Sequence, residues 1–137
     1  MPPESPESPA MRLLIVDDSN LIRTFIARIV ANKGYAPELG LPGLRIVGLA
    51  RTGTEAIELA RQTTPDIVTL DITMPEMDGL ECLDQLMQIV PRARVLMVSA
   101  LSDKATALSA LKKGARGFLH KPFTEEDLVN ALREVLA

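Results

Sequence analysis

The sequence predicts an α/β fold, a doubly wound sheet of five parallel strands accompanied by five helices. Two observations carry this prediction. Short runs rich in apolar residues alternate five times with segments of helical periodicity along the 137-residue chain, and two of these runs, residues 13–16 and 95–98, are apolar throughout. Such alternation is typical of parallel sheets with helices on both faces, and strands buried on both faces are continuously apolar.

The first strand and the first helix lie before Gly34. Residues 13–16 are an apolar run too short for a helix and therefore predict a strand. Either Ser19 or Asn20 can cap the helix that follows, and Gly34 suits the position just after its C-terminus. The helix itself is predicted from apolar residues at helical spacing, which are Leu21, Ile22, Phe25, Ile26, Ile29 and Val30.

The next segment supplies a loop, a strand and a helix. Residues 34–43 are rich in proline and glycine and predict a surface loop. Because this loop leads into the start of a strand, we expect it far from the carboxyl ends of the strands. Residues 45–50 predict the second strand. Residues 53–62 predict the second helix, whose apolar side carries Ala56, Ile57 and Ala60.

The third strand is the one around which the chain is organised. Residues 67–70 form a short apolar run with β-branched residues, and the run ends on the carboxylate of Asp71. Pro75 and Gly79 then predict a turn. A third helix follows until Pro91 stops it, and its apolar positions are Leu80, Leu83, Leu86, Met87 and Val90.

The last third of the chain completes the alternation. Residues 95–98 predict the fourth strand, which ends on Ser99, and residues 117–120 predict the fifth, which ends on Lys121. Between them a fourth helix carries Ala105, Leu108 and Leu111. The last helix opens on residues 124–127, Thr-Glu-Glu-Asp, which is close to a capping box. Its apolar stripe comprises Leu128, Ala131, Leu132, Val135 and Leu136.

Composition limits the partners and the compartment. Residues 1–10 alternate proline, glutamate and serine, so we expect a disordered tail followed by a single domain over residues 11–137. The net charge of −3 gives no reason to expect nucleic acid or an anionic membrane as a partner. No apolar run approaches the roughly 20 residues that span a bilayer. A single cysteine, Cys82, suits a reducing cytoplasm. We expect a monomer or a weak dimer.

Polar side chains follow four of the five predicted strands. They are Asp17 and Asp18 after the first, Asp71 after the third, Ser99 after the fourth and Lys121 after the fifth. The carboxyl ends of parallel strands share one edge, where open α/β sheets bind ligands. Three converging carboxylates repel one another unless a cation joins them, and Mg²⁺ prefers oxygen ligands. An acidic group, a metal and an ammonium are what phosphoryl transfer requires, and aspartate is an established phosphoryl acceptor.

Four motifs surround these polar residues, namely Asp17-Asp18, residues 71–79 (Asp-Ile-Thr-Met-Pro-Glu-Met-Asp-Gly), Ser99-Ala100 and residues 113–123 (Lys-Gly-Ala-Arg-Gly-Phe-Leu-His-Lys-Pro-Phe). With these motifs, the chain from Met11 to its end resembles the receiver domain of two-component response regulators, and it is most similar to the stand-alone chemotaxis (CheY-like) type. The resemblance implies a flavodoxin-like or CheY-like doubly wound fold with strand order 2-1-3-4-5. It also implies that the phosphoryl donor is a phosphohistidine on a sensor histidine kinase.

The resemblance implies a role for each residue of the metal and phosphoryl sites. Asp71 is implied to accept the phosphoryl group. Asp18 and Asp71 are implied to bind Mg²⁺ directly, together with the backbone carbonyl of Thr73, while Asp17 acts through a bound water. Lys121 is implied to pair with the phosphoryl oxygens.

The resemblance also implies a switch. Ser99 is implied to hydrogen-bond a phosphoryl oxygen, and the ring of Phe118 to turn in response, with the small Ala100 leaving it room. The turn changes the face formed by the fourth helix, the fifth strand and the fifth helix, which binds an unidentified downstream protein. The peptide bond before Pro122 is implied to be cis, an isomer that X-Pro bonds reach at about 0.5–1 kcal/mol.

Several functions remain open from the sequence. The domain could act in chemotaxis, as a phosphorelay shuttle, as a phosphate sink, or as the receiver half of a truncated DNA-binding regulator. A phosphate-independent scaffold is disfavoured because every member of the site is present. A hydrolase of the haloacid-dehalogenase kind needs a second acid two residues after the nucleophile, where this chain has Thr73. A nucleotide-binding domain lacks support, since no glycine-rich loop follows the first strand. The kinase, the output partner and the phosphoryl lifetime are also open.

Overall fold

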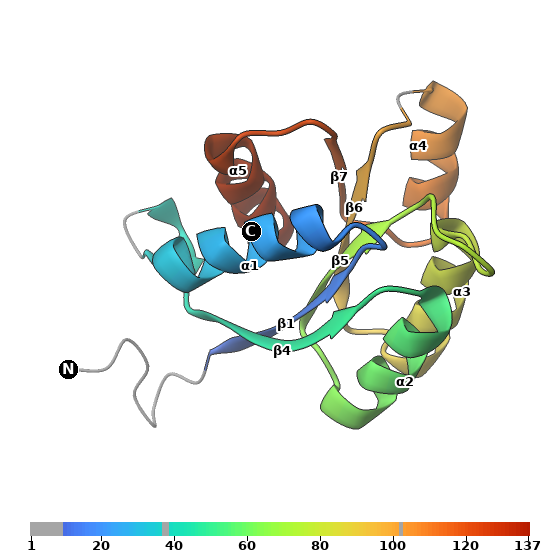
Figure 1. Cartoon of the computed structure of the whole chain (residues 1–137), viewed down its shortest axis with the longest axis horizontal. Coiled ribbons are helices and arrows are strands. Elements are labelled where there is room, and N and C mark those ends of the chain that lie inside the picture. Colours follow the sequence, from blue (N-terminus) through green and yellow to red (C-terminus); the bar gives the residue numbers. More distant parts are fainter. Residues whose placement is uncertain (1–9, 37–38, 102) are drawn as a thin grey trace.

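Five parallel strands form one sheet in the computed structural model, which describes residues 10–36, 39–101 and 103–137 (Figure 1). The order β4-β1-β5-β6-β7 confirms the predicted 2-1-3-4-5 arrangement. The strands are β1 Met11–Val16, β4 Leu44–Ala50, β5 Ile67–Asp71, β6 Arg94–Ser99 and β7 Gly117–His120. Apart from Ala10, the predicted N-terminal tail lies outside the described residues.

Five helices cover the two faces of this sheet (Figure 1). They are α1 Asn20–Lys33, α2 Gly53–Thr63, α3 Gly79–Ile89, α4 Lys104–Lys112 and α5 Glu125–Leu136. Successive strand residues point to opposite faces, so Leu13 packs with α1 and α5 while Leu14 packs with α2 and α3. Within the described residues, no helix combines the length and apolar character needed to cross a membrane.

The helices begin at side-chain caps, which explains their positions. Ser19 caps α1 and thereby decides between the two predicted candidates, Ser19 and Asn20. Thr52, Asp78 and Asp103 cap the three middle helices in the same way. The capping box predicted for the last helix is confirmed, because Thr124 and the side chain three residues later each accept from the other's backbone amide. Each cap satisfies amides that would otherwise lack partners.

The segment after α1 differs from the plain loop that its proline and glycine content predicted. It contains two short antiparallel strands, β2 (Tyr35–Ala36) and β3 (Leu41–Pro42). Leu41 is almost fully buried in the core beneath α1 and α5, which gives this pair a packing role. Figure 1 places the pair beside the C-terminal end of α1, away from the carboxyl ends of β1 and β5. Gly34 ends α1 in a right-handed conformation, with φ −64°, so the helix does not end on a left-handed residue.

Three leucines that supported the helix predictions face the solvent instead of the core. Leu21 is 81% exposed, and Leu108 and Leu111 are 53% and 50% exposed. Within α4 only Ala110 is buried, because this helix lies against α3 through one narrow side. Helical spacing identifies a helix and its apolar face, but it does not establish that another element covers that face.

Gly79 fixes the turn that follows β5. Its amide donates to the carbonyl oxygen of Ile72 at 2.6 Å. A Cβ at this position would collide with the carbonyl oxygen of Asp71 and lie 2.6 Å from the Cα of Ile72. The turn predicted from Pro75 and Gly79 therefore depends on the absence of a side chain at Gly79, because the collision involves backbone that carries the candidate nucleophile.

Replacing Gly79 by alanine is expected to lower the free energy of unfolding by roughly 2–3 kcal/mol, since rigid backbone must move to admit the methyl group. Gly117→Ala is the matched control. Its Cβ would meet only flexible side-chain atoms of Val135 and Leu96, at 3.1 and 3.2 Å. Urea denaturation measures both variants, and equal losses for the two would contradict this explanation of Gly79.

Candidate functional site

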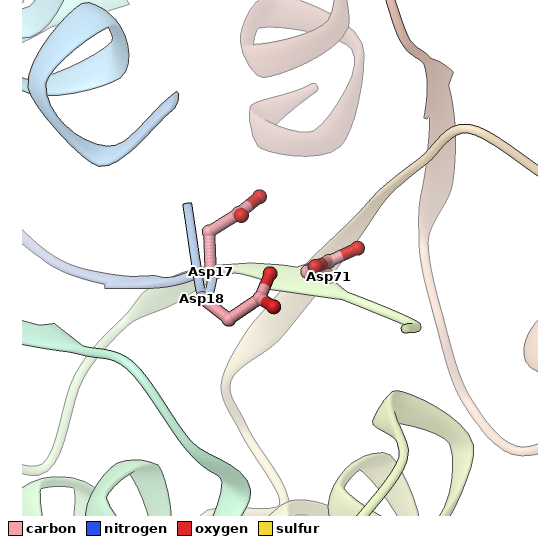
Figure 2. Close-up of side chains that lie close together, drawn as sticks. All are labelled: Asp17, Asp18 and Asp71. Atoms are coloured by element: carbon pink, nitrogen blue, oxygen red, sulfur yellow. The ribbon is translucent and has the colours of Figure 1, made fainter. Parts of the chain in front are cut away.

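Three carboxylates meet at the carboxyl edge of the sheet. Asp17 and Asp18 follow β1, and Asp71 is the last residue of β5, which is the neighbour of β1. One oxygen from each of the three lies within 4.8 Å of the others. Figure 2 shows the side chains of Asp17 and Asp18 diverging beside that of Asp71. The three aspartates therefore lie together at the carboxyl edge of the sheet, as the sequence predicted.

Burial gives the three acids different electrostatic environments. Asp17 and Asp71 are 1% and 3% exposed, whereas Asp18 is open to solvent. Burial is the main reason that the pKa of Asp71 rises from 3.8 to about 6. The carboxylates of Asp17 and Asp18 raise this pKa further, while the ammonium of Lys121 opposes the rise. A buried carboxylate with a raised pKa beside a specific cation is a common mark of a functional site.

Lys121 approaches the acids from the end of β7, which is an edge strand of the sheet. Its Nζ lies 2.9 Å from Oδ2 of Asp17 and 3.5 Å from Oδ1 of Asp71. The residue follows β7, and its peptide bond to Pro122 is cis, as the family resemblance implied. A single ammonium therefore contacts both buried carboxylates.

Ser99 completes the rim between β5 and β7. It is the last residue of β6 and is fully buried, and its Oγ accepts a hydrogen bond from the amide of Leu101 at 3.0 Å. Its carbonyl oxygen accepts from the amide of Lys121 at 2.8 Å. This backbone bond ties the strand end that carries the hydroxyl to the one that carries the ammonium.

Thr73 and Phe118 are the two remaining residues that the sequence assigned to the site and its switch. Thr73 follows β5 in the loop toward α3, with its side chain exposed. Phe118 lies in β7 and is partly buried against the core under α2 and α3. It also lines a hollow of about 410 Å³ between β7 and α5, together with Leu119, His120, Pro122, Asp127, Asn130, Ala131 and Glu134.

Arg23 was not among the residues predicted from the sequence, although it touches the site. It is only 9% exposed, and its Nη1 donates to the backbone carbonyl oxygen of Asp17 at 2.6 Å. One sequence signal could have revealed it. Arg23 falls three and seven residues before Ile26 and Val30, so it occupies the buried stripe of α1, where a charged residue is unusual.

The donor atoms suit a hard divalent cation. All three converging groups are carboxylates, and Mg²⁺ prefers oxygen ligands while keeping several waters. Within the described part of the chain, Oδ2 of Asp17 is buried without a hydrogen-bond donor aligned to it, although the ammonium of Lys121 lies 2.9 Å away. This oxygen can therefore still bind a water or a cation. By the chemistry of its donors the cluster fits Mg²⁺.

Comparison with known proteins agrees with this geometry. A family model described as the response regulator receiver domain matches residues 13–133. The chemotaxis protein CheY of Listeria monocytogenes is 43% identical over 124 residues, which are 90% of this chain and 97% of that protein. CheY of Thermotoga maritima is 39% identical over 124 residues, which are 90% of this chain and 96% of that protein.

Longer regulators and solved structures extend the comparison. The nitrate/nitrite response regulator NarL of Escherichia coli is 35% identical, but the match covers 91% of this chain and only 54% of NarL. A chain in the crystal structure of the CheX-CheY-BeF3-Mg²⁺ complex from Borrelia burgdorferi has a TM-score of 0.83 at 34% identity, with 93% of this chain and 90% of that chain covered. The protein therefore belongs to the response regulator receiver domain family, and it matches the chemotaxis (CheY) members along almost their whole length.

Proposed function

We propose that residues 11–137 form a receiver domain that stores a phosphoryl group on Asp71, taken from a phosphohistidine of a sensor histidine kinase. One observation carries the proposal. A buried carboxylate ends the central strand, with two further acids within 4.8 Å and an ammonium 3.5 Å away. We assign the Mg²⁺ site to Asp17, Asp18 and Asp71 together with the carbonyl of Thr73.

The transfer requires little covalent chemistry from the protein. An oxygen of ionised Asp71 donates an electron pair to phosphorus, and the phosphorus–nitrogen bond breaks with its electrons returning to the imidazole of the kinase. The ammonium of Lys121 offsets negative charge on the phosphoryl oxygens, and the hydroxyl of Ser99 donates a hydrogen bond to one of them. When bound, Mg²⁺ supplies the positive charge that allows three carboxylates and a phosphoryl group to share this space.

The residues around Asp71 favour storage over turnover. An aspartate-nucleophile hydrolase needs a general acid two residues after the nucleophile, and that position holds Thr73. The resulting acyl phosphate therefore persists until water or a second protein removes the phosphoryl group. This is the behaviour of a signalling domain that catalyses only its own phosphorylation and dephosphorylation.

The output face is assigned to α4, β7 and α5. Ser99 moves toward the new phosphoryl oxygens and Phe118 turns into the space that it leaves, which shifts a balance between two conformations. The solvent exposure of Leu108 and Leu111 supports this assignment, because exposed apolar side chains at neighbouring helical positions suit a protein partner. The hollow of about 410 Å³ beside Phe118 lies on the same face.

Chemotaxis is the favoured setting for this output. Relatives named as chemotaxis proteins match this chain over 97% of their own length, whereas NarL extends well beyond the match. A relay shuttle, a phosphate sink and the receiver half of a longer DNA-binding regulator are the alternatives. We place the exchange in the cytoplasm, since Cys82 is buried and unpaired, as suits a reducing compartment. Neither a nucleic acid nor a membrane is part of the proposal.

A time course with acetyl phosphate tests this function against its competitors. We expect phosphoprotein to accumulate in the presence of Mg²⁺ and inorganic phosphate to appear only slowly once the donor is removed. Rapid phosphate release over many turnovers without phosphoprotein would indicate a hydrolase instead. An absence of labelling under all conditions would indicate a phosphate-independent scaffold.

A further inference from the structure

Arg23 is a buried cation that contacts the backbone of the acidic site. It lies in the first turns of α1, and Nη1 donates to the carbonyl oxygen of Asp17 at 2.6 Å. Nη2 donates to Oδ1 of Asn20 at 3.1 Å. One planar guanidinium thus spans the turn that follows β1, and its fork shape fixes both contacts at once.

This contact completes the restraint of Asp17. The amide of Ser19 donates to Oδ1 of Asp17 at 2.9 Å, and Nζ of Lys121 lies 2.9 Å from Oδ2. Together with Arg23 on the carbonyl, each oxygen of Asp17 has a nitrogen group beside it, two from the start of α1 and one from the residue that follows β7. The peptide unit is planar, so holding this carbonyl also fixes the direction of the following amide. That amide belongs to Asp18, whose exposed carboxylate has no comparable support from burial.

Packing alone does not explain an arginine at this position. A buried guanidinium is costly to desolvate unless charge or hydrogen bonds compensate it. Within the residues that the structure describes, no carboxylate forms a direct ion pair with Arg23. Methionine or leucine would fill the same stripe beside Ile26 and Val30 without this cost. What the arginine adds is the hydrogen bond to the Asp17 carbonyl and the one to Asn20.

We propose that Arg23 is a positioning residue for the metal site, which holds the Asp17–Asp18 peptide so that both carboxylates face the cation. The proposal rests on the proposed function, because it concerns the Mg²⁺ site assigned there. Removing a residue that hydrogen-bonds to a metal ligand and orients it commonly weakens metal binding by about 10–100-fold. Arg23 acts on the ligands through the backbone and does not itself touch the cation or the phosphoryl group.

The test is the Mg²⁺ affinity of the unphosphorylated protein, measured by calorimetric titration with Mg²⁺ alone. Arg23→Met keeps the length of the apolar stem and removes both hydrogen bonds, so we expect binding about 10–100-fold weaker. Arg23→Lys keeps the charge but has no rigid fork, and we expect an intermediate loss. Asn20→Ala removes only the second anchor of the guanidinium and is expected to weaken binding by a few fold.

Two control variants separate positioning from general damage to α1. Ile29→Val removes one buried methylene from the same helix, and Arg28→Met removes an exposed charge from it. Both are expected to bind Mg²⁺ like the wild type, even where Ile29→Val matches the loss of thermal stability in Arg23→Met. Phosphorylation of Arg23→Met by acetyl phosphate should need more Mg²⁺ for half-maximal rate yet approach the wild-type rate at saturation.

Wild-type Mg²⁺ affinity in a folded Arg23→Met variant would overturn the inference. Tighter binding would overturn it too, because Arg23 would then act by repelling the cation. Equal weakening in Ile29→Val would also overturn it. If Arg23→Met does not fold, wild-type Mg²⁺ affinity in both Arg23→Lys and Asn20→Ala would overturn the inference instead. Failure of the wild-type protein itself to bind Mg²⁺ would instead count against the proposed function.

Discussion

Replacing Asp71 by asparagine is expected to stabilise the protein at pH 7.5 by roughly 2–3 kcal/mol, a magnitude that follows from a pKa rise of about two units. Asparagine has the shape of the protonated acid without its titration. The wild-type protein must hold a buried carboxylate next to Asp17 and Asp18, and Lys121 compensates this only in part. The substitution removes that repulsion.

The gain in stability from Asp71→Asn should depend on pH. The pKa of Asp71 is about 6 in the folded protein and 3.8 as the ordinary value, so between these pH values the folded state binds more protons than the unfolded state. The contribution of Asp71 to stability therefore falls as the pH rises from about 4 to 6 and stays low above that range. Asparagine does not titrate, so the advantage of Asp71→Asn should shrink on acidification and disappear below about pH 4.

Urea denaturation of both proteins at pH 4 and pH 7.5, without divalent cations, measures the effect. Addition of Mg²⁺ at pH 7.5 should stabilise the wild type more than the variant, because the variant has lost a charged ligand. Equal unfolding midpoints at pH 7.5 would contradict the electrostatic description of the site. A variant that is stabilised equally at both pH values would do so as well, since the difference would then not come from titration.

Replacing Lys121 by methionine is expected to slow phosphorylation of Asp71 about 100–1000-fold, the usual loss when one preorganised electrostatic donor is removed from a transition state. The ammonium lies 3.5 Å from Oδ1 of Asp71, where the phosphoryl group would arrive. Methionine preserves the apolar stem but not the charge. The rate follows from intact mass measured during incubation with acetyl phosphate and saturating Mg²⁺.

Mg²⁺ binding separates this effect from simple damage to the site. The ammonium of Lys121 lies 2.9 Å from a buried oxygen of Asp17 and repels a Mg²⁺ ion bound nearby. Lys121→Met should therefore bind Mg²⁺ at least as tightly as the wild type. Lys113→Met is the control, because that ammonium pairs with Asp84 between α4 and α3, at 2.8 Å. A Lys121→Met protein that is phosphorylated within tenfold of the wild-type rate would exclude the proposed role of the ammonium.

The sequence predicted the sheet and its polar edge for the same physical reason. Strands buried on both faces are largely apolar, so the polar residue that follows such a run marks the end of the strand. Asp71, Ser99 and Lys121 were located in this way, and right-handed crossovers then brought them to one edge. The positions of the helices followed from periodicity and from capping residues such as Thr124.

Features that depend on tertiary contact were harder to predict. Periodicity placed Leu108 and Leu111 on a helix, but only the packing of α4 decided that they face solvent. The two short strands around Leu41 arise from contacts with α5 that local composition does not encode. The position of Arg23 in the buried stripe of α1 was the one sequence signal for this residue, while its contact with the carbonyl oxygen of Asp17 has no signature in the sequence.

The most direct test of the central claim is the intact mass of the protein after incubation with acetyl phosphate. The wild type with Mg²⁺ should gain one acid-labile phosphoryl group, while the wild type with EDTA should gain none. Asp71→Asn should remain unmodified even with Mg²⁺, although it is folded and more stable. Equal phosphorylation of wild type and Asp71→Asn would contradict the assignment of Asp71 as the phosphoryl acceptor.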